Sequence, residues 1–319
     1  MRRIIKLGMS ALPLLIIFGL LYAGLFVKPQ AVAADVQPMV IERADKFYGI
    51  ALTASGGTWA AGSNGKILHS NDAGHSWKLQ TRLSNLALQD VAAWDELRAV
   101  AVGDDGVVMI TADGGKAWRT VTVPRSTISN KLIRVKTLPL GEGWAVGEGG
   151  AVLHTVNFGL MWTQVGAPED TAWNDIAFHH QRAVMVGEFG LIRLSTDGGV
   201  TWATVTSTVK SSLMAVAFQD PMNAVAVGLG GVVLRSMDGG ASWKQQKAAT
   251  NEHLFDVLWD GKRWVAVGDK GILLAGVGDQ WRATRNDATA RGWYTRIAQH
   301  GSRYYFAGSA LVSMATGAL

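Results

Sequence analysis

After its first 34 residues, the chain repeats one pattern of short apolar stretches separated by glycine and acidic residues. In the copy at residues 88–123, apolar stretches at 88–94, 99–103, 107–111 and 118–123 alternate with turns rich in Gly and Asp. Alternating or continuous Val, Ile and Leu bounded by such turns is typical of β-strands joined in hairpins. Each copy therefore predicts four antiparallel strands, here named A to D.

Seven copies of this pattern follow one another. The glycine that ends strand B recurs with spacings of 41, 44, 40, 41, 40 and 40 residues, at Gly62, Gly103, Gly147, Gly187, Gly228, Gly268 and Gly308. About 40 residues per four strands is the size of a propeller blade. A helical solenoid would need glycine-free stretches with a 3.6-residue period, and none follows residue 34. We therefore predict an all-β fold over residues 35–319: a seven-bladed β-propeller of four-stranded antiparallel blades.

The two ends of the chain predict how the ring closes. The seventh copy has strand A near 294–299, strand B near 304–308 and strand C near 310–314, and then ends without strand D. The stretch Met39–Arg43 precedes the first strand A and has no partner of its own. Because an unpaired sheet edge invites aggregation, we expect this N-terminal strand to close the last blade.

An Asp box, Ser/Thr-x-Asp-x-Gly-x-x-Trp, recurs between strands C and D. The sixth copy is two residues short and ends at Trp281, and the seventh keeps only Ser313 and Gly317. The carboxylate can accept N–H bonds within the turn, the glycine supplies a positive φ, and the indole covers the sheet edge. Because it repeats from blade to blade, we interpret the box as structural rather than as a calcium or sugar site. Its acidic or amide residue and its tryptophan are Asp72 and Trp77, Asp113 and Trp118, Asn157 and Trp162, Asp197 and Trp202, and Asp238 and Trp243.

The first 34 residues have the parts of an export signal. Arg2, Arg3 and Lys6 precede an apolar run over residues 7–27, and the small residues Ala31–Ala33 offer a cleavage site. The apolar run is also long enough to cross a bilayer. Because the charge lies on its N-terminal side, both a signal peptide and an uncleaved anchor place the body outside the cytoplasm.

The leader also accounts for most of the net charge of +5. Removing its four cations from the 30 leaves 26 against 25 acids. A nucleic-acid surface needs a concentrated basic stripe on the folded body, so we expect no nucleic-acid partner. The chain has no cysteine, which excludes disulfides, thiolate metal sites and cysteine nucleophiles.

Two phrases carry a family resemblance: AVGDDGVVMITADGGKAW at 101–118 and AVGLGGVVLRSMDGGASW at 226–243. They resemble the Asp-box, or bacterial neuraminidase repeat, propellers. More narrowly, they are similar to the photosystem II stability/assembly factor family, which has relatives in non-photosynthetic bacteria. The resemblance covers residues 35–319. It implies a periplasmic or thylakoid-lumenal propeller without catalysis or cofactor, which helps early reaction-centre intermediates to assemble. Its bacterial relatives look like accessory proteins of envelope complexes, including transporters of the resistance-nodulation-division type.

The residues do not favour an enzyme. A sialidase needs a tyrosine nucleophile, an arginine cluster and an acidic pair, and its usual Arg-Ile-Pro signature is absent. Four of the five tyrosines, Tyr48, Tyr294, Tyr304 and Tyr305, fall inside predicted strands. Histidines such as the adjacent His179 and His180 lack a metal-ligand spacing. We therefore expect no catalytic residue, metal or cofactor.

Candidate binding residues come from the propeller geometry, because strand A of each blade lines the central channel. One early strand-A position per blade places three carboxylates and two guanidiniums in a ring: Asp90, Arg134, Asp175, Asp256 and Arg296. The B–C turns add Asp104, Glu148, Glu188 and Asp269 on the face that we expect to surround this ring. We hypothesise that this face docks a polar segment of a membrane protein; the alternative is a solvated channel with internal ion pairs.

These expectations lead to one main interpretation and two alternatives. The main one is a non-catalytic exported scaffold that binds a membrane-protein complex, such as photosystem II reaction-centre subunits, and assists its assembly or stability. The first alternative is a periplasmic accessory protein of an envelope transporter. The second is a glycan-binding or glycan-cleaving Asp-box protein. The fold alone does not separate these, because function depends on the site.

Overall fold

The computed structural model describes residues 2–26, 39–82, 85–247, 249–285 and 292–319. The chain divides into two compact units, Met1–Met39 and Val40–Leu319. The first contains helix α1 (Arg2–Phe26). Among the residues whose side chains are described, no helix combines the length and the apolarity that crossing a membrane requires. Cleavage or anchoring of this unit stays a prediction.

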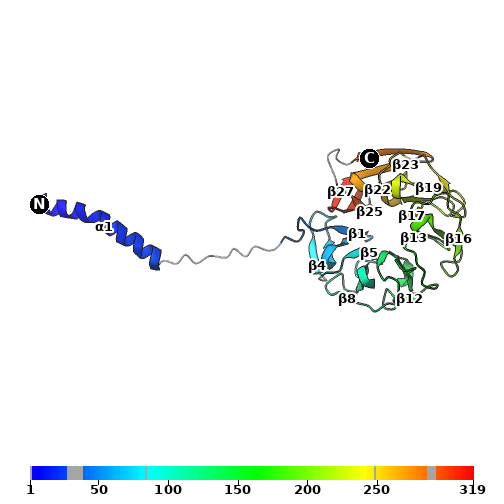
Figure 1. Ribbon diagram of the computed structural model, residues 1–319, viewed down its shortest axis with the longest axis horizontal. Coiled ribbons are helices and arrows are strands. Elements are labelled where there is room, and N and C mark those ends of the chain that lie inside the picture. The colour runs from blue at the N-terminus through cyan, green and yellow to red at the C-terminus, as the bar shows by residue number, and fades with distance from the viewer. Residues whose placement is uncertain (1, 27–38, 83–84, 248, 286–291) are drawn as a thin grey trace. The chain divides into compact units, whose positions relative to one another are not determined.

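The second unit is a ring of seven antiparallel sheets, six with four strands and one with three among the described residues (Figure 1). This confirms the predicted all-β, seven-bladed propeller. In chain order the blades consist of β1 (Phe47–Leu52), β2 (Thr58–Gly62), β3 (Lys66–Ser70) and β4 (Lys78–Arg82); β5 (Leu88–Ala93), β6 (Ala99–Gly103), β7 (Val108–Thr111) and β8 (Arg119–Thr120); β9 (Leu132–Thr137), β10 (Gly143–Gly147), β11 (Val152–Thr155) and β12 (Thr163–Gln164); β13 (Trp173–His179), β14 (Arg182–Gly187), β15 (Ile192–Ser195) and β16 (Ala203–Val205); β17 (Leu213–Phe218), β18 (Ala224–Gly228), β19 (Val233–Ser236) and β20 (Lys244–Gln245); β21 (Leu254–Trp259), β22 (Trp264–Gly268), β23 (Ile272–Val277) and β24 (Gln280–Arg285); and β25 (Tyr294–His300), β26 (Arg303–Gly308) and β27 (Val312–Ala315).

Short 3₁₀ turns join several of these strands. They are η1 (Ser63–Gly65), η2 (Asp104–Gly106), η3 (Pro139–Gly141), η4 (Glu188–Gly190), η5 (Leu229–Gly231), η6 (Asp269–Gly271) and η7 (Thr316–Ala318). In η2, Asp105 and Gly106 have φ of 52° and 64°. Two successive positive φ values are the geometry of a tight hairpin turn, which explains the Gly at the second position.

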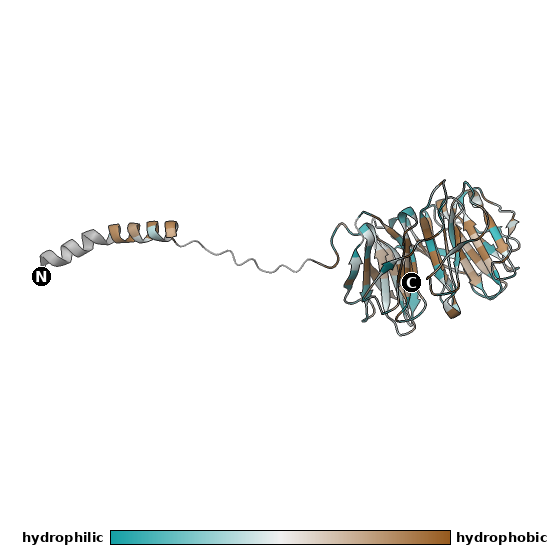
Figure 2. Ribbon diagram, turned by 90° about the horizontal axis from the view of Figure 1, so that it is seen from below, coloured by the Kyte–Doolittle hydropathy of each residue, from teal (hydrophilic) through white to brown (hydrophobic). Residues whose placement is uncertain are grey.

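The core lies between neighbouring blades. Strand B of each blade is buried along nearly its whole length; in β6, every residue is buried. Val100 and Val102 of blade 2, for example, share one hydrophobic cluster with Leu132, Val135 and Ala145 of blade 3. In Figure 2 the hydrophobic colour accordingly concentrates on the strands of the ring. The inner strands β1, β5, β13, β17 and β25 surround the centre, while β4, β8, β12 and β16 lie at the periphery (Figure 1).

The closure of the last blade differs from the prediction. Met39–Arg43 forms no strand, and β25, β26 and β27 make a three-stranded sheet among the described residues. The segment is held by other contacts. Val40 packs against the cluster that contains Tyr305, and its carbonyl accepts a hydrogen bond from Lys66 Nζ (3.1 Å). Lys66, which is 1% exposed, also pairs with Asp45. The segment is therefore held next to blade 1 by a buried ion pair and not by the backbone pairing that we expected.

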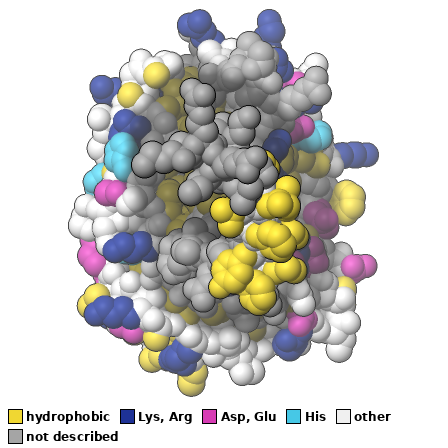
Figure 3. All heavy atoms as spheres, turned by 90° about the vertical axis from the view of Figure 1, so that its left-hand side faces the viewer, with side chains coloured by type: hydrophobic (Ala, Val, Ile, Leu, Met, Phe, Trp, Pro, Cys, Tyr) yellow, Lys and Arg dark blue, Asp and Glu magenta, His cyan; other side chains and the backbone are white. Residues whose placement is uncertain are grey.

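Strand direction gives the ring two distinct faces. The A–B and C–D connections emerge on one face, which we call the Asp-box face, and the B–C turns emerge on the opposite face. Hydrogen bonds join the two connections of the Asp-box face within one blade: Gly114 N donates to Leu97 O (2.9 Å) and Phe158 N to Gly141 O (2.8 Å). On the side drawn in Figure 3, basic and acidic side chains are interspersed rather than gathered in a patch of one sign.

Candidate functional site

A bulge in strand A positions the predicted central ring. In blade 2, Leu88 pairs with Gly103 and Asp90 with Val102, so Gln89 has no partner in the ladder. The same irregularity occurs in the other six blades. A bulge of this kind re-aims the next side chain. The positions that follow it are Gly49, Asp90, Arg134, Asp175, Ala215, Asp256 and Arg296.

The aspartates of this ring join neighbouring blades through the backbone. Asp90 of blade 2 accepts a hydrogen bond from Val135 N of blade 3 (3.1 Å). Asp175 accepts one from Val216 N (3.0 Å), and Asp256 one from Ile297 N (2.9 Å). Each even-numbered blade is therefore fastened to the next blade by a buried carboxylate.

The arginines of the ring connect blades that are not adjacent in sequence. Arg296 Nε lies 3.1 Å from Asp90 Oδ1, and its Nη1 lies 3.3 Å from Asp256 Oδ2. Because seven is odd, this alternation leaves out blade 1: such an aspartate bond joins it neither to blade 7 nor to blade 2. Gly49 takes this place in blade 1, and a Cβ there would come within 2.6 Å of Asp90 Cα. Arg296, itself in blade 7, thus contacts the aspartate of the adjacent blade 6 and, past blade 1, that of blade 2.

Arg134 and Lys136 complete the network. Arg134 Nε lies 3.2 Å from Asp175 Oδ1, and its Nη2 contacts the carbonyls of Met214 (3.3 Å) and Phe255 (3.4 Å). Lys136 Nζ lies 3.3 Å from the same Asp175 oxygen. The sequence prediction, which took one position per blade, missed Lys136. It follows Arg134 by two residues, and this period-2 spacing was the signal that could have found it.

The network is buried and electrically balanced, with three cations and three carboxylates. Burial raises the pKa of Asp90, against the opposing effect of Arg296 and Arg134. For Asp175, burial also raises the pKa, but Lys136 and the arginines outweigh it and hold the value below its usual range. Burial lowers the pKa of Lys136. The five predicted ring residues are thus brought together as a buried cluster at most 8% exposed, and their docking role stays a prediction.

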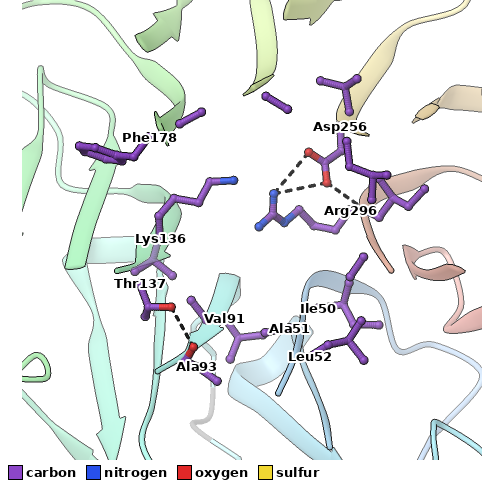
Figure 4. A pocket seen from close by; sticks show the side chains of 18 of the residues that line it. Ile50, Ala51, Leu52, Val91, Ala93, Lys136, Thr137, Phe178, Asp256 and Arg296 are labelled. Carbon is purple, nitrogen blue, oxygen red and sulfur yellow. Dashed lines mark hydrogen bonds and ion pairs between the residues drawn. The ribbon is translucent and has the colours of Figure 1, made fainter. Parts of the chain in front are cut away.

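A funnel of about 420 Å³ opens above this network on the Asp-box face (Figure 4). Lys136 and Arg296 point into it, and Lys136 is the most exposed member of the network, at 29%. The ends of the A strands form apolar walls and a rim, with Leu52, Leu138, Phe178, Phe218 and Leu258. The funnel therefore has apolar side chains at its rim and polar groups at its base, where Lys136 is the most exposed.

The four predicted B–C turn acids lie on the opposite face from the funnel mouth. Each is partly exposed and already engaged. Asp104 accepts a hydrogen bond from Gln89 Nε2 (2.9 Å) and Glu148 from Ser129 Oγ (2.6 Å). Glu188 accepts one from Ala172 N (3.1 Å), and Asp269 one from Lys270 N (2.9 Å). These acids and the funnel do not form one surface.

The Asp boxes form self-contained turns. Asp72 Oδ1 accepts a hydrogen bond from Ser76 N (2.8 Å) and its other oxygen binds the Ser76 hydroxyl (2.5 Å). Asp197 and Asp238 repeat both contacts with Thr201 and Ser242. Asp113 keeps only the backbone contact, to Ala117 N (3.0 Å). Because all of these bonds are made within the box itself, they stabilise the turn.

The box tryptophans pack between blades rather than over a sheet edge. Trp162 of blade 3 is buried in the cluster of blade 2 residues that includes Val100 and Ile110, and Trp243 of blade 5 packs on blade 4. Trp118 and Trp202 meet Trp59 and Trp144 of their preceding blades edge-on. Each of these box tryptophans thereby packs its blade against the preceding blade.

Acid is expected to weaken the propeller through these turns. Hydrogen bonds from Thr201 lower the pKa of Asp197 to about 2, and hydrogen bonds from Ser76 lower that of Asp72 further. A carboxylate with a lowered pKa stabilises the fold above its unfolded pKa of about 4, and this contribution is lost as the pH falls to about 2. The free energy of unfolding, measured against pH, should decrease over this window. An Asp197→Asn variant should show a shallower decrease, and equal slopes would contradict the prediction.

Among the described residues, no group of three or more His, Asp or Glu side chains is placed to hold a metal ion.

The four tyrosines of the body lie in strands β1, β25 and β26. Burial and a hydrogen bond to Asp260 raise the pKa of Tyr304 to about 12, which disfavours the phenolate that a tyrosine nucleophile would need.

Comparison with known families decides the chain's affiliation. The profile of the photosynthesis system II assembly factor YCF48 family matches residues 82–209 and 201–304, together more than two thirds of the chain. The chain belongs to this family. Membership confirms the resemblance seen in the two repeat phrases, and a family of assembly factors agrees with the expected non-catalytic role. No curated protein matches the sequence.

Solved structures share the fold. YCF48 bound to a D1 peptide superimposes with a TM-score of 0.69 at 16% identity, covering 83% of this chain and 90% of that one. YCF48 from Cyanidioschyzon merolae gives the same TM-score and identity, over 84% and 94%. PorZ, a surface component of the type-IX secretion system of Porphyromonas gingivalis, gives 0.64 at 14% identity, over 85% of this chain and 37% of that one.

Proposed function

We propose that this member of the YCF48 family is an exported, non-catalytic scaffold that binds a segment of a membrane-protein subunit and assists its assembly. The partner that we favour is a reaction-centre subunit of the photosystem II type, met in the periplasm or thylakoid lumen. The family match over residues 82–304 carries this proposal. The complex of YCF48 with a D1 peptide supports a peptide segment as the bound element.

The funnel of the Asp-box face offers a place for such a segment. Its apolar walls suit aliphatic side chains, and Lys136 offers a charge-assisted hydrogen bond to a carboxylate that enters it. Arg134 would still pair with Asp175 without Lys136. Without Lys136, each of the three carboxylates keeps an arginine partner, and two cations then face three carboxylates.

Lys136→Gln is expected to weaken partner capture by about tenfold or more, the value of one hydrogen bond to a charged group, while the unfolding midpoint changes little. Capture is measured by titrating the tagged chain against solubilised membranes. Lys116→Gln, at an exposed site of the same face, serves as the matched control. Equal capture by both variants would exclude the funnel base as the contact.

A second candidate is an accessory protein of an envelope complex. The fold shared with PorZ, itself a component of a bacterial secretion system, favours it, and a transporter is the partner that we would expect. Purification of the tagged full chain from its native membranes after mild cross-linking distinguishes the two. Reaction-centre subunits would support the assembly factor, and transporter or secretion subunits the alternative. Absence of any membrane protein would contradict both and return a glycan-binding role to consideration.

A further inference from the structure

On the Asp-box face, the end of blade 3 differs from that of every other blade with a full Asp box. In blades 1, 2, 4 and 5 the Asp box carries an aspartate, but blade 3 has Asn157. Three neighbouring positions of this box are apolar and exposed: Val156, Leu160 and Met161. The adjacent A–B turn adds Leu140, which is 94% exposed. We call these five residues the blade-3 tip.

The asparagine keeps the turn and removes its charge. Asn157 Oδ1 accepts a hydrogen bond from Met161 N (2.9 Å) and one from Thr155 Oγ1 (2.9 Å). Asp113 of blade 2 makes the same two kinds of contact, with Ala117 N (3.0 Å) and Thr111 Oγ1 (2.9 Å). An aspartate would therefore satisfy this turn equally well. The turn itself gives no reason for the neutral residue.

The hydroxyl of the box is also missing in blade 3. Ser76, Thr201 and Ser242 each bind the second carboxylate oxygen of their box aspartate. Blade 2 has Ala117 at this position but keeps its aspartate, whereas blade 3 has Met161 and no aspartate. Charge and hydroxyl have thus been replaced together by an amide and an exposed thioether. Burying a charge against an apolar surface is costly, so both changes lower the cost of covering the tip.

The tip is held rigidly from beneath. The ring of Phe158 lies 3.7 Å under the Arg98 guanidinium and meets Trp94 edge-on. A Cβ on Gly141 would come within 2.8 Å of the same ring, so the Leu140 turn rests directly on Phe158. Glu142, two residues after Leu140, is engaged by Trp144 Nε1 (3.0 Å) and His154 Nε2 (3.1 Å). A fixed surface loses little conformational entropy on binding.

We infer that the blade-3 tip is a docking surface for an apolar, uncharged segment of the membrane-protein partner. The inference rests on the proposed function. Leu138, which opens the A–B turn of blade 3, lines the rim of the funnel, and Leu140 of the tip follows it by two residues on the same turn of the Asp-box face. Methionine and leucine on an exposed, charge-free surface suit a protein partner, and the tip carries no Trp or Tyr of the kind that anchors proteins in lipid.

The test uses a benzophenone side chain at two sites of the full chain in its native membranes. One replaces Leu140, and the control replaces Phe189, which is 73% exposed on a B–C turn of the opposite face. The expected result is a cross-link from position 140 to an apolar stretch of an integral membrane protein, with none from position 189. A cross-link only to lipid, or only to a second copy of this chain, would overturn the inference.

A charge at the tip provides the second measurement. Asn157→Asp is expected to leave the unfolding midpoint unchanged and to reduce both the position-140 cross-link and partner recovery by about tenfold. The matched control is Met237→Asn, which gives blade 5 the residue that blade 1 carries at the same box position. If Asn157→Asp recovers the partner as well as the parent chain does, the docking surface is wrong while the proposed function stands. If the parent chain itself recovers no membrane protein, the proposed function fails and the docking surface with it.

Discussion

Replacing Arg296 by methionine is expected to lower the free energy of unfolding by about 3–5 kcal/mol, the usual cost of removing one partner from a buried ion pair. Arg296 is the guanidinium that Asp90 and Asp256 share, at 3.1 and 3.3 Å. Both carboxylates are almost fully buried, so the variant leaves them without their main counter-charge. The loss is measured by urea denaturation followed by circular dichroism.

An exposed arginine provides the control. Arg82 pairs with Glu42 at 2.9 Å, but both side chains are more than 40% exposed, and such a pair contributes about 0–1 kcal/mol. Arg82→Met should therefore change the free energy of unfolding by less than about 1 kcal/mol. If the two variants prove equally stable, the central network does not hold the ring together.

The origin of the loss can be tested by removing the charges as well. In an Arg296→Met variant that also carries Asp90→Asn and Asp256→Asn, each amide oxygen can still accept the backbone N–H of Val135 or Ile297. The centre then holds Arg134 and Lys136 against Asp175, so no buried carboxylate lacks a counter-charge. This triple variant is expected to regain most of the stability lost by Arg296→Met, because replacing a whole buried ion pair is often nearly neutral.

The fold was predictable because its signals repeat. One glycine in each of the seven blades and one box tryptophan in six of them, at a nearly constant spacing, define the blades without any long-range information. The central ring was predictable in composition, since strand A lines the channel of any propeller. The burial of the ring could not be predicted, because it depends on contacts that Arg134 and Arg296 make with blades distant in sequence.

Two other features could not be predicted from the sequence, for separate physical reasons. The segment Met39–Arg43 has the composition of a strand, but pairing depends on register against β27, which composition does not specify. Instead, the next residues are fixed by the pair between Asp45 and Lys66. From the sequence, the blade-3 tip could be recognised only as an Asp box that has asparagine in place of aspartate. Its interpretation as a docking surface also depends on the exposure of Leu140 on the neighbouring turn, which only the structure shows.

A large packing effect is expected from Trp162→Ala, at about 3–5 kcal/mol. This indole is 5% exposed, fills the gap between blades 2 and 3, and donates a hydrogen bond from Nε1 to Gly159 O (3.0 Å). Its removal leaves a cavity lined by Val100 and Ile110. Both blades are fixed in the ring, so they cannot move together to fill it. Urea denaturation of the variant gives the change directly.

Trp77→Ala is the informative comparison, because the same box position in blade 1 faces a different neighbour. Trp77 is only half-buried and packs towards Tyr305 of the three-stranded blade. Its loss should cost clearly less than that of Trp162, since water already reaches the indole and the cavity is open. If the two substitutions cost the same, the seam between blades 7 and 1 is as tightly packed as the seam between blades 2 and 3. Closure of the ring would then rest on side-chain packing at every seam, and the Arg296 network would be secondary.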